Sequence, residues 1–172
     1  RDFDPDARSM LSDRGIDTSG LVQVEGDTFR WSGSYREDLN SAVTLETQLN
    51  VFADFAPELG DAHKALPFLF LANIDPTLQA SVLSQMTTRP KMVACDTMNL
   101  WIDIARPALV SLVEQVDILL INEAEAMQLT EADGVASAAD RLLDMGLRAV
   151  VIKRGEYGAV VFHKEFTFAV PA

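Results

Sequence analysis

Three polar motifs in the second half of the chain each follow a short apolar run, and their residue types suit a charged ligand. The first contains Asp96 and Asn99, the second is residues 122–125 (Asn-Glu-Ala-Glu), and the third contains Gly155 and Gly158. Carboxylates and amides can hold hydrated magnesium and phosphate, and glycine lets a backbone approach a nucleotide closely. Ligands of open α/β sheets bind beyond the carboxyl ends of parallel strands, so the three motifs predict one shared cleft.

The spacing of Asn122 and Glu125 has two interpretations. An N-cap residue and its capping-box partner also lie three positions apart, so the pair can simply begin a helix. In the functional interpretation, the helix N-terminus and the amide attract phosphate, and the carboxylate holds a hydrated Mg²⁺ nearby. The two interpretations are compatible, and the sequence leaves both open.

The other polar positions also have structural alternatives. Gly155 and Gly158 suit the turn of a β-hairpin, which is the favoured interpretation of that pair in isolation. Asp96 and Asn99, like Asn73 after the preceding apolar run, can cap loops, although a buried carboxylate needs a partner or a ligand. Their recurrence at successive strand ends is what makes them candidates for a site.

Cys95 is predicted to be a core residue rather than a nucleophile, because neither His63 nor His163 has an evident relation to it. Two histidines so far apart in the chain also argue against a zinc site.

The elements that must position these motifs alternate between strand and helix from Leu66 onward. Apolar runs predict strands at 68–72, 91–95, 116–121 and 148–153, and helices are expected at 76–86, 101–115 and 135–145. A short helix is also expected from Asn122 to about Leu129, and residues 158–163 should turn back beside the last strand. Pro107 is the weak point of the second long helix. Continuous apolar runs and this alternation predict parallel strands joined by right-handed crossovers, with helices on both faces of the sheet.

The first part of the chain has a different texture. Residues 3–14 are predicted to form a helix that ends at Gly15, and 21–24 with 28–32 are predicted to form a hairpin around Gly26. A further strand is expected at 46–51. The aromatic and basic side chains near the hairpin either face a substrate or pack on their neighbours; they are Arg30, Trp31, Tyr35 and Arg36.

Composition favours one compact globular domain with a real core. Of the 172 residues, 48% are hydrophobic, and 14 basic against 26 acidic residues give a formal charge of −12. That charge argues against a nucleic-acid backbone or an anionic membrane as partner. The single cysteine fits a reducing, cytoplasmic setting, and no uninterrupted apolar run is long enough to span a bilayer. The chain starts without a methionine and stops within an expected strand, so we expect it to be a piece of a longer protein.

Together these segments resemble the ribokinase-like, or PfkB-type, carbohydrate kinase family. The resemblance rests on residues 16–20, 96–99, 122–125 and 152–158, in that order and spacing, and the N-x-x-E motif at 122–125 is its most specific part. It implies an α/β fold, a three-layer α/β/α sandwich with a mostly parallel sheet and a small β lid. The chain would be a partial domain, incomplete at both ends, with about 20–52 as lid and hinge strands and about 66–172 as the α/β core.

The resemblance implies phosphoryl transfer from ATP to a hydroxyl of a sugar or nucleoside, with Mg²⁺ and optionally a monovalent cation. By carry-over, Glu125 would lie near the metal, and Asn73, Asp96 and Asn99 would face the substrate. The residues that would bind the nucleotide are Asn122, Lys153, Gly155, Glu156 and Gly158. A homodimer through the lid is a further expectation.

Two family motifs are missing from these residues: the Gly-Gly substrate motif near the amino end and the Gly-Ala-Gly-Asp motif that supplies the base and the anion hole. The catalytic base is therefore expected beyond Ala172, and this polypeptide alone is predicted to be inactive or nearly so. Lys153 and Arg154 also replace a pair that is usually small or apolar, and Trp101 stands where a basic residue is usual. The alternative hypothesis is a non-catalytic nucleotide-binding or assembly module with a kinase-like fold.

Overall fold

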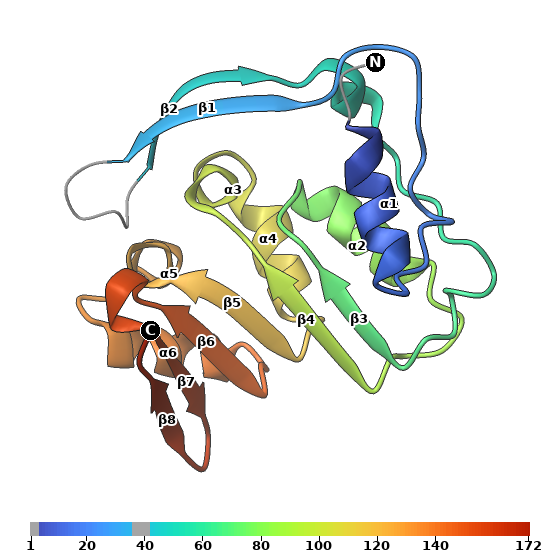
Figure 1. The fold of residues 1–172 in the computed structure, drawn as a ribbon. Coiled ribbons are helices and arrows are strands. Elements are labelled where there is room, and N and C mark those ends of the chain that lie inside the picture. The colour runs from blue at the N-terminus through green and yellow to red at the C-terminus, as the bar shows by residue number, and fades with distance from the viewer. Residues whose placement is uncertain (1–3, 36–41) are drawn as a thin grey trace. The chain divides into compact units, whose positions relative to one another are not determined.

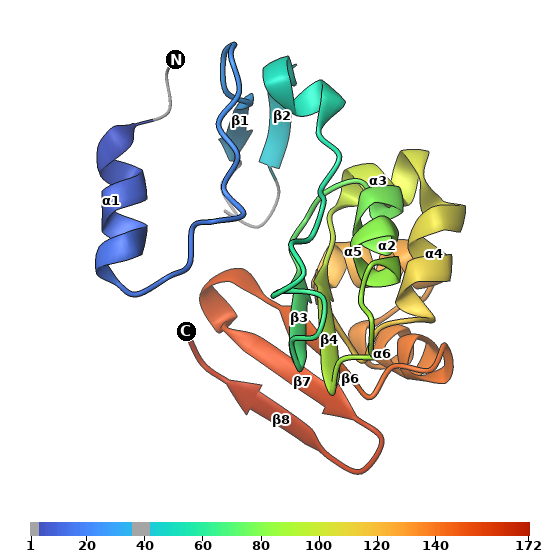
Figure 2. The same cartoon turned by 90° about the vertical axis from the view of Figure 1, so that its right-hand side faces the viewer.

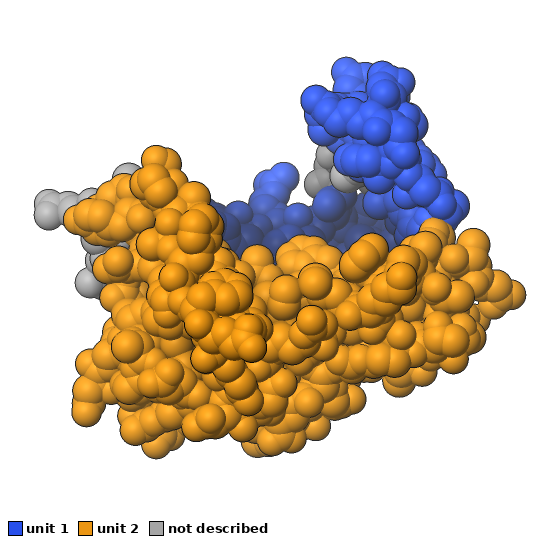
Figure 3. All heavy atoms as spheres, turned by 90° about the horizontal axis from the view of Figure 1, so that it is seen from below, with its two compact units in different colours: residues 1–56 blue, residues 57–172 orange. Residues whose placement is uncertain are grey.

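The computed structural model describes residues 4–35 and 42–172, which fall into two compact units. The first unit comprises residues 1–56 and the second residues 57–172 (Figure 3). Each unit is considered by itself.

The second unit is built on a six-stranded sheet whose strands follow one another in chain order (Figure 1). The strands are β3 (Phe68–Leu71), β4 (Met92–Asp96), β5 (Ile118–Asn122), β6 (Ala149–Lys153), β7 (Ala159–His163) and β8 (Thr167–Val170). Strands β3 to β6 pair in parallel, whereas β7 and β8 are antiparallel to their neighbours. All four predicted parallel strands and the returning strand are confirmed, with shifts of one or two residues at their ends.

The crossovers between the parallel strands are helical, and the helices begin where the sequence supplies caps. They are α2 (Pro76–Ser84), α3 (Asn99–Ile104), α4 (Arg106–Val113), α5 (Glu123–Thr130) and α6 (Val135–Asp144). At the start of α2, the Asp75 carboxylate accepts a hydrogen bond from the backbone N–H of Thr77 at 2.7 Å, and Pro76 occupies the first turn. Gly146 follows α6 with φ 109°, as the predicted stop.

The long helix expected over 101–115 is broken into two. It starts earlier, at Asn99, and is interrupted at Ala105, whose φ of −137° and ψ of 25° are not helical. The second piece, α4, carries Pro107 in its first turn, where the missing N–H of proline leaves no helical carbonyl unpaired. The weak point expected at Pro107 is thus observed as a complete break of the helix at Ala105, two residues earlier.

The helices of this unit form one layer on one face of the sheet, because α2 contacts α4, α4 contacts α3, α3 contacts α5, and α5 contacts α6 (Figure 2). Strand residues that point toward this layer are fully buried: Val93, Cys95, Leu119, Ile121, Val150 and Ile152. On the edge strand β3, Phe68 and Phe70 are 66% and 58% exposed. Burial is therefore seen on the face that the helices cover, whereas Phe68 and Phe70 expose the other face of β3. The helices expected on both faces are found on one face only among the described elements of this unit (Figure 2).

The first unit contains a helix and a two-stranded antiparallel sheet. The elements are α1 (Pro5–Asp13), β1 (Arg30–Tyr35), β2 (Ala42–Gln48) and a 3₁₀ helix (Asn50–Asp54). The helix ends as predicted, since Gly15 follows it with φ 72°. Arg36 and the side chain of Tyr35 lie outside the described residues.

The predicted hairpin around Gly26 is wrong, because β1 pairs with β2 instead of with residues 21–24. The carbonyl groups directly after Gly26 bond to residues further along the chain. The side-chain amide of Asn50 donates to the carbonyl of Thr28 at 2.9 Å, and the backbone N–H of Val51 donates to the carbonyl of Asp27 at 3.2 Å. These bonds continue the ladder between β1 and β2. Within this hairpin, the indole N–H of Trp31 donates to Thr44 Oγ1 at 3.1 Å, so Trp31 packs across its own sheet.

No helix among residues 4–35 and 42–172 is both long enough and apolar enough to cross a bilayer.

The tight turn between β6 and β7 gives a first prediction. Gly158 has φ 85°, and a Cβ atom there would collide with the carbonyl oxygen of Val170. Gly146 has an equally unusual φ of 109°, but nothing lies within 4 Å of its added Cβ. We expect Gly146→Ala to cost about 1–3 kcal/mol of backbone strain and Gly158→Ala to cost clearly more. Urea unfolding of both variants measures the difference, and equal losses would contradict the collision.

Cys95 gives a second prediction. Burial, with a smaller contribution from the charge of Asp96, raises the pKa of this thiol to about 12. Because the thiolate is the reactive form, iodoacetamide at pH 8 should leave Cys95 unmodified in the folded chain and alkylate it once guanidinium unfolds the chain. Mass spectrometry of both samples checks this, and fast alkylation of the folded chain would show that Cys95 is accessible.

Candidate functional site

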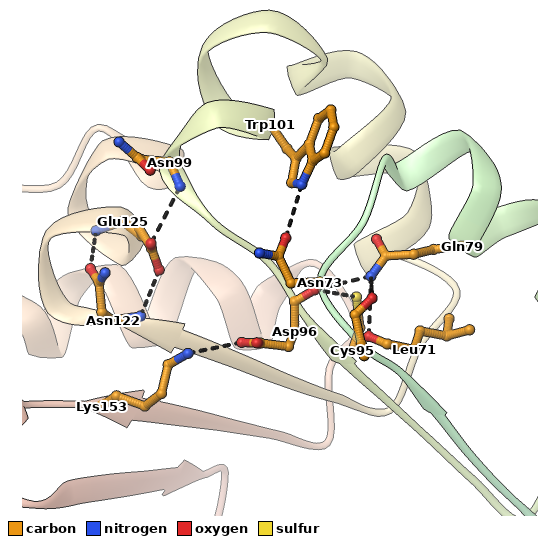
Figure 4. Close-up of polar contacts among 11 residues, drawn as sticks. Leu71, Asn73, Gln79, Cys95, Asp96, Asn99, Trp101, Asn122, Glu125 and Lys153 are labelled. Atoms are coloured by element: carbon orange, nitrogen blue, oxygen red, sulfur yellow. Dashed lines mark hydrogen bonds and ion pairs between the residues drawn. The ribbon is translucent and has the colours of Figure 1, made fainter. Parts of the chain in front are cut away.

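The carboxyl ends of the four parallel strands bring the predicted polar residues to one edge of the sheet (Figure 4). Asn73 follows β3, Asp96 ends β4, Asn122 ends β5 and Lys153 ends β6. In the register of the sheet, Asn122 lies directly opposite Lys153. Parallel pairing therefore gathers residues that are widely separated in the sequence.

Lys153 and Asp96 form an ion pair that spans the end of the intervening strand β5. The Lys153 ammonium donates to Asp96 Oδ1 at 2.9 Å, and the two side chains are 45% and 26% exposed. An ion pair as exposed as this contributes at most about 1 kcal/mol to stability. Its significance is positional, because it places a cation and a carboxylate together where the strands end.

Asn122 and Glu125 form the capping box that their spacing allows. Asn122 Oδ1 accepts from the backbone N–H of Glu125 at 2.8 Å, and Glu125 Oε2 accepts from the backbone N–H of Asn122 at 2.9 Å. The structural interpretation of this motif is confirmed. The capping box also fixes the position of the Glu125 carboxylate at the edge of the sheet.

Glu125 connects this turn to the neighbouring helix. Its Oε1 accepts from the backbone N–H of Asn99 at 3.3 Å, so one carboxylate links the starts of α5 and α3. The residue is only 7% exposed. Burial raises the pKa of this carboxyl group, while the N–H of Asn122 and the charge of Lys153 act in the opposite direction. Asn99 thus enters the cluster through its backbone.

Asn73 contacts a side chain of α3 that was not predicted to belong to the site. The indole N–H of Trp101, in α3, donates to Asn73 Oδ1 at 2.9 Å. Spacing in the sequence gave no sign of this contact, because the two residues belong to different strand-to-helix units. They meet only because β3 and β4 are neighbours.

Gln79 is a second residue that the sequence did not reveal. It lies in α2, is 1% exposed, and its side-chain N–H group lies within hydrogen-bonding distance of three carbonyl oxygens. These belong to Leu71 at 3.1 Å, Ala72 at 2.9 Å and Asp96 at 3.0 Å. Among the described residues, no group bonds to Gln79 Oε1 or to the buried hydroxyl of Thr97. A polar residue inside a helix gave no pattern that could have signalled this role.

The glycine motif forms the turn between β6 and β7, as its structural interpretation predicts. Gly155 begins a short 3₁₀ helix (Gly155–Tyr157), and the backbone N–H of Arg154 donates to the carbonyl of Gly158 at 2.8 Å. The side chain of Arg154 is paired with Glu123 at 3.1 Å and lies over the ring of Tyr157. Glu156 is exposed at this turn. This turn begins just after Lys153, the last residue of β6.

The carboxylates of Asp96 and Glu125 form a donor set that could hold a hydrated Mg²⁺. Within the part of the chain that the structure describes, no three His, Cys, Asp or Glu side chains gather in a metal-binding group. Both Glu125 oxygens already accept backbone hydrogen bonds, and the residue is buried. Mg²⁺ commonly keeps several waters and binds through one or two carboxylates plus substrate phosphates, which Asp96 and Glu125 suit.

The chain is similar in sequence and in fold to known proteins. The cytidine kinase of Thermococcus kodakarensis is 28% identical over 159 residues, which cover 88% of this chain and 54% of that protein. The chain therefore spans about half the length of this curated relative.

Solved structures show the same fold at low identity. The adenosine kinase from Sinorhizobium meliloti superposes with a TM-score of 0.74 at 16% identity, covering 99% of this chain and 56% of that one. The Burkholderia thailandensis nucleoside kinase in complex with inosine gives 0.69 at 17% identity, covering 98% and 55%. Residues 2–172 match the pfkB family carbohydrate kinase, and the chain belongs to this family.

Proposed function

We propose that the whole protein transfers the γ-phosphoryl group of ATP to a hydroxyl group of a nucleoside or sugar. The observation that carries this proposal is the convergence of Asp96, Asn122, Glu125 and Lys153 at the carboxyl ends of three adjacent parallel strands. Phosphoryl transfer depends chiefly on in-line positioning and on neutralising the charge of the transferred group. This edge offers a cation, amides and carboxylates for both tasks.

The electrostatics of the cluster support a requirement for Mg²⁺. Asp96 and Glu125 contribute two carboxylates and Lys153 one cation, while Arg154 is occupied by Glu123. The phosphates of ATP would meet a locally negative edge unless a divalent cation accompanied them. Mg²⁺ would supply charge neutralisation when bound, and Glu125 would orient its water ligands from a buried, fixed position.

We assign the remaining residues to the nucleotide and to the phosphoryl acceptor. Asn122 and Lys153 would contact the phosphates, and the turn formed by Gly155, Glu156 and Gly158 would line the nucleotide. Asn73, Asp96 and Asn99 would face the acceptor substrate: Asn73 follows β3, Asp96 ends β4 and Asn99 begins α3.

In this proposal residues 20–52 provide the lid and its hinge, and the α/β core extends over 66–172. The lid sheet carries exposed apolar side chains, among them Val43 and Leu45 at 41% and 67% exposure. An exposed sheet edge with apolar side chains favours pairing with a second copy, which supports the proposed homodimer. The alternative of a non-catalytic module receives no support from the similar proteins named above, which are kinases, or from the matched family.

The activity itself is tested on the full-length protein with Mg·ATP and cytidine, inosine, adenosine or ribose as acceptor. We expect ADP and a phosphorylated product with at least one acceptor and none after EDTA treatment. Because the Gly-Ala-Gly-Asp motif is absent from these 172 residues, we expect the chain alone to be about 10²–10⁴-fold slower or inactive. Failure of the full-length protein with every acceptor, or turnover without a divalent cation, would refute the proposal.

Glu125→Gln tests the proposed link to Mg²⁺ in the full-length enzyme. We expect roughly 10- to 100-fold weaker apparent Mg²⁺ affinity, so the rate falls most at limiting Mg²⁺.

The loss in folding stability of Glu125→Gln should be small at neutral pH. Burial raises the pKa of Glu125, so its contribution to stability is greatest at low pH and is lost as pH rises through that pKa. Glutamine removes the buried charge but can accept only one of the two backbone hydrogen bonds.

The matched control is Glu123→Gln, which removes a charge two positions away but breaks only the half-exposed pair with Arg154. It should leave the Mg²⁺ dependence unchanged.

The rate of the wild-type enzyme should also fall with decreasing pH as Glu125 takes up a proton. This decrease at low pH should be absent in Glu125→Gln. An unchanged rate of Glu125→Gln at limiting Mg²⁺ would remove the role assigned to this residue.

A further inference from the structure

The contact between Trp101 and Asn73 restricts what Asn73 can offer to a ligand. An indole N–H only donates, so the group that faces it must be an acceptor, and within a carboxamide only the oxygen accepts. The 2.9 Å contact therefore fixes which way the amide of Asn73 is turned. Figure 4 shows the amide oxygen directed at the indole and the nitrogen turned away from it.

The backbone directly before Asn73 is also held in place. The buried amide of Gln79 donates to the carbonyl of Ala72, directly before Asn73, and to the carbonyl of Asp96 on the adjacent strand. One side chain thus ties the end of β3 to the end of β4. Asn73 and Asp96 consequently keep fixed relative positions.

The two side chains offer opposite hydrogen-bonding character. Asn73, with its oxygen occupied by Trp101, presents the donors of its NH₂ group, and this residue is exposed. The ionised carboxylate of Asp96 only accepts, and one of its oxygens already receives Lys153. The carboxyl ends of the strands therefore present a hydrogen-bond donor after β3, from Asn73, and a hydrogen-bond acceptor at the end of β4, from Asp96.

We propose that Trp101 is a specificity-determining positioning residue that locks Asn73 as a hydrogen-bond donor. The phosphoryl-acceptor substrate then presents an acceptor atom, a hydroxyl or carbonyl oxygen or an unprotonated ring nitrogen, to the amide of Asn73. This inference rests on the proposed function for the placement of the substrate at this edge. It adds the chemical character of the group that Asn73 recognises and the residue that sets it.

Asn73→Asp is the decisive variant because a carboxylate has nearly the same shape and still accepts from the indole of Trp101. It replaces the NH₂ donors by an acceptor, so a substrate acceptor atom loses its partner and faces a negative oxygen. We expect the Kd of the best-binding compound among cytidine, inosine, adenosine and ribose to rise at least about tenfold. The KM for ATP should change by less than about twofold. A change in substrate Kd without a change in the KM for ATP distinguishes a lost substrate contact from a general structural defect.

Trp101→Phe keeps an aromatic ring but removes the N–H. Without the indole donor the amide of Asn73 can turn over. If both orientations are equally populated, the Kd of the same compound rises about twofold. In ¹H–¹⁵N spectra, the indole resonance of Trp101 should shift in Asn73→Ala but stay near its position in Asn73→Asp, with Trp31 as internal reference.

Calorimetry on the full-length protein separates this inference from the proposed function. A wild type that binds one of the four compounds without phosphorylating it refutes the proposed function alone, and the variants still decide the inference by their Kd values. Asn73→Asp binding as tightly as the wild type overturns the inference while the kinase activity stands. A wild type that binds none of the four compounds overturns both.

Discussion

Parallel pairing of β3, β4, β5 and β6 is the constraint on which the site depends. After β3, β4 and β5 a crossover must return the chain before the next strand can run in the same direction, so the carboxyl ends of these strands open into loops on one side of the sheet. The carboxyl end of β6 lies on the same side and leads into the turn to the antiparallel strand β7. The helices of the crossovers cover one face of the sheet and bury the alternate strand residues beneath them. The first residues after each strand are left as the places where polar side chains can meet a ligand.

Polar groups at this edge are held by one another before any ligand arrives. Glu125 accepts from the backbone at the starts of two helices, and Gln79 donates to the ends of two strands. A buried amide or carboxylate without such partners would be costly, so these contacts make the strand ends rigid as well as polar. The ion pair of Lys153 with Asp96 and the contact of Trp101 with Asn73 are more exposed than the bonds made by Glu125 and Gln79.

Several elements could be predicted because their signals are local. The apolar runs of the parallel strands, the capping box of Asn122 and Glu125, and the stop at Gly146 depend on residues only a few positions apart. The hairpin around Gly26 was predicted wrongly for the complementary reason. Strand β1 pairs instead with β2, and Asp27 and Thr28 bond to Val51 and Asn50, partners that lie more than 20 positions further along the chain.

By itself, the sequence determined the order of strands and helices, the positions of the strand-end motifs and the resemblance to a kinase family, because periodicity and motif spacing are properties of the chain. Tertiary structure alone decided that Lys153 reaches Asp96 across β5, that Gln79 ties β3 to β4, and that Trp101 turns the amide of Asn73. These contacts join residues from different strand-to-helix units. Hydrogen bonds act over about 3 Å, so their partners are set by which strands become neighbours, and no local pattern encodes that.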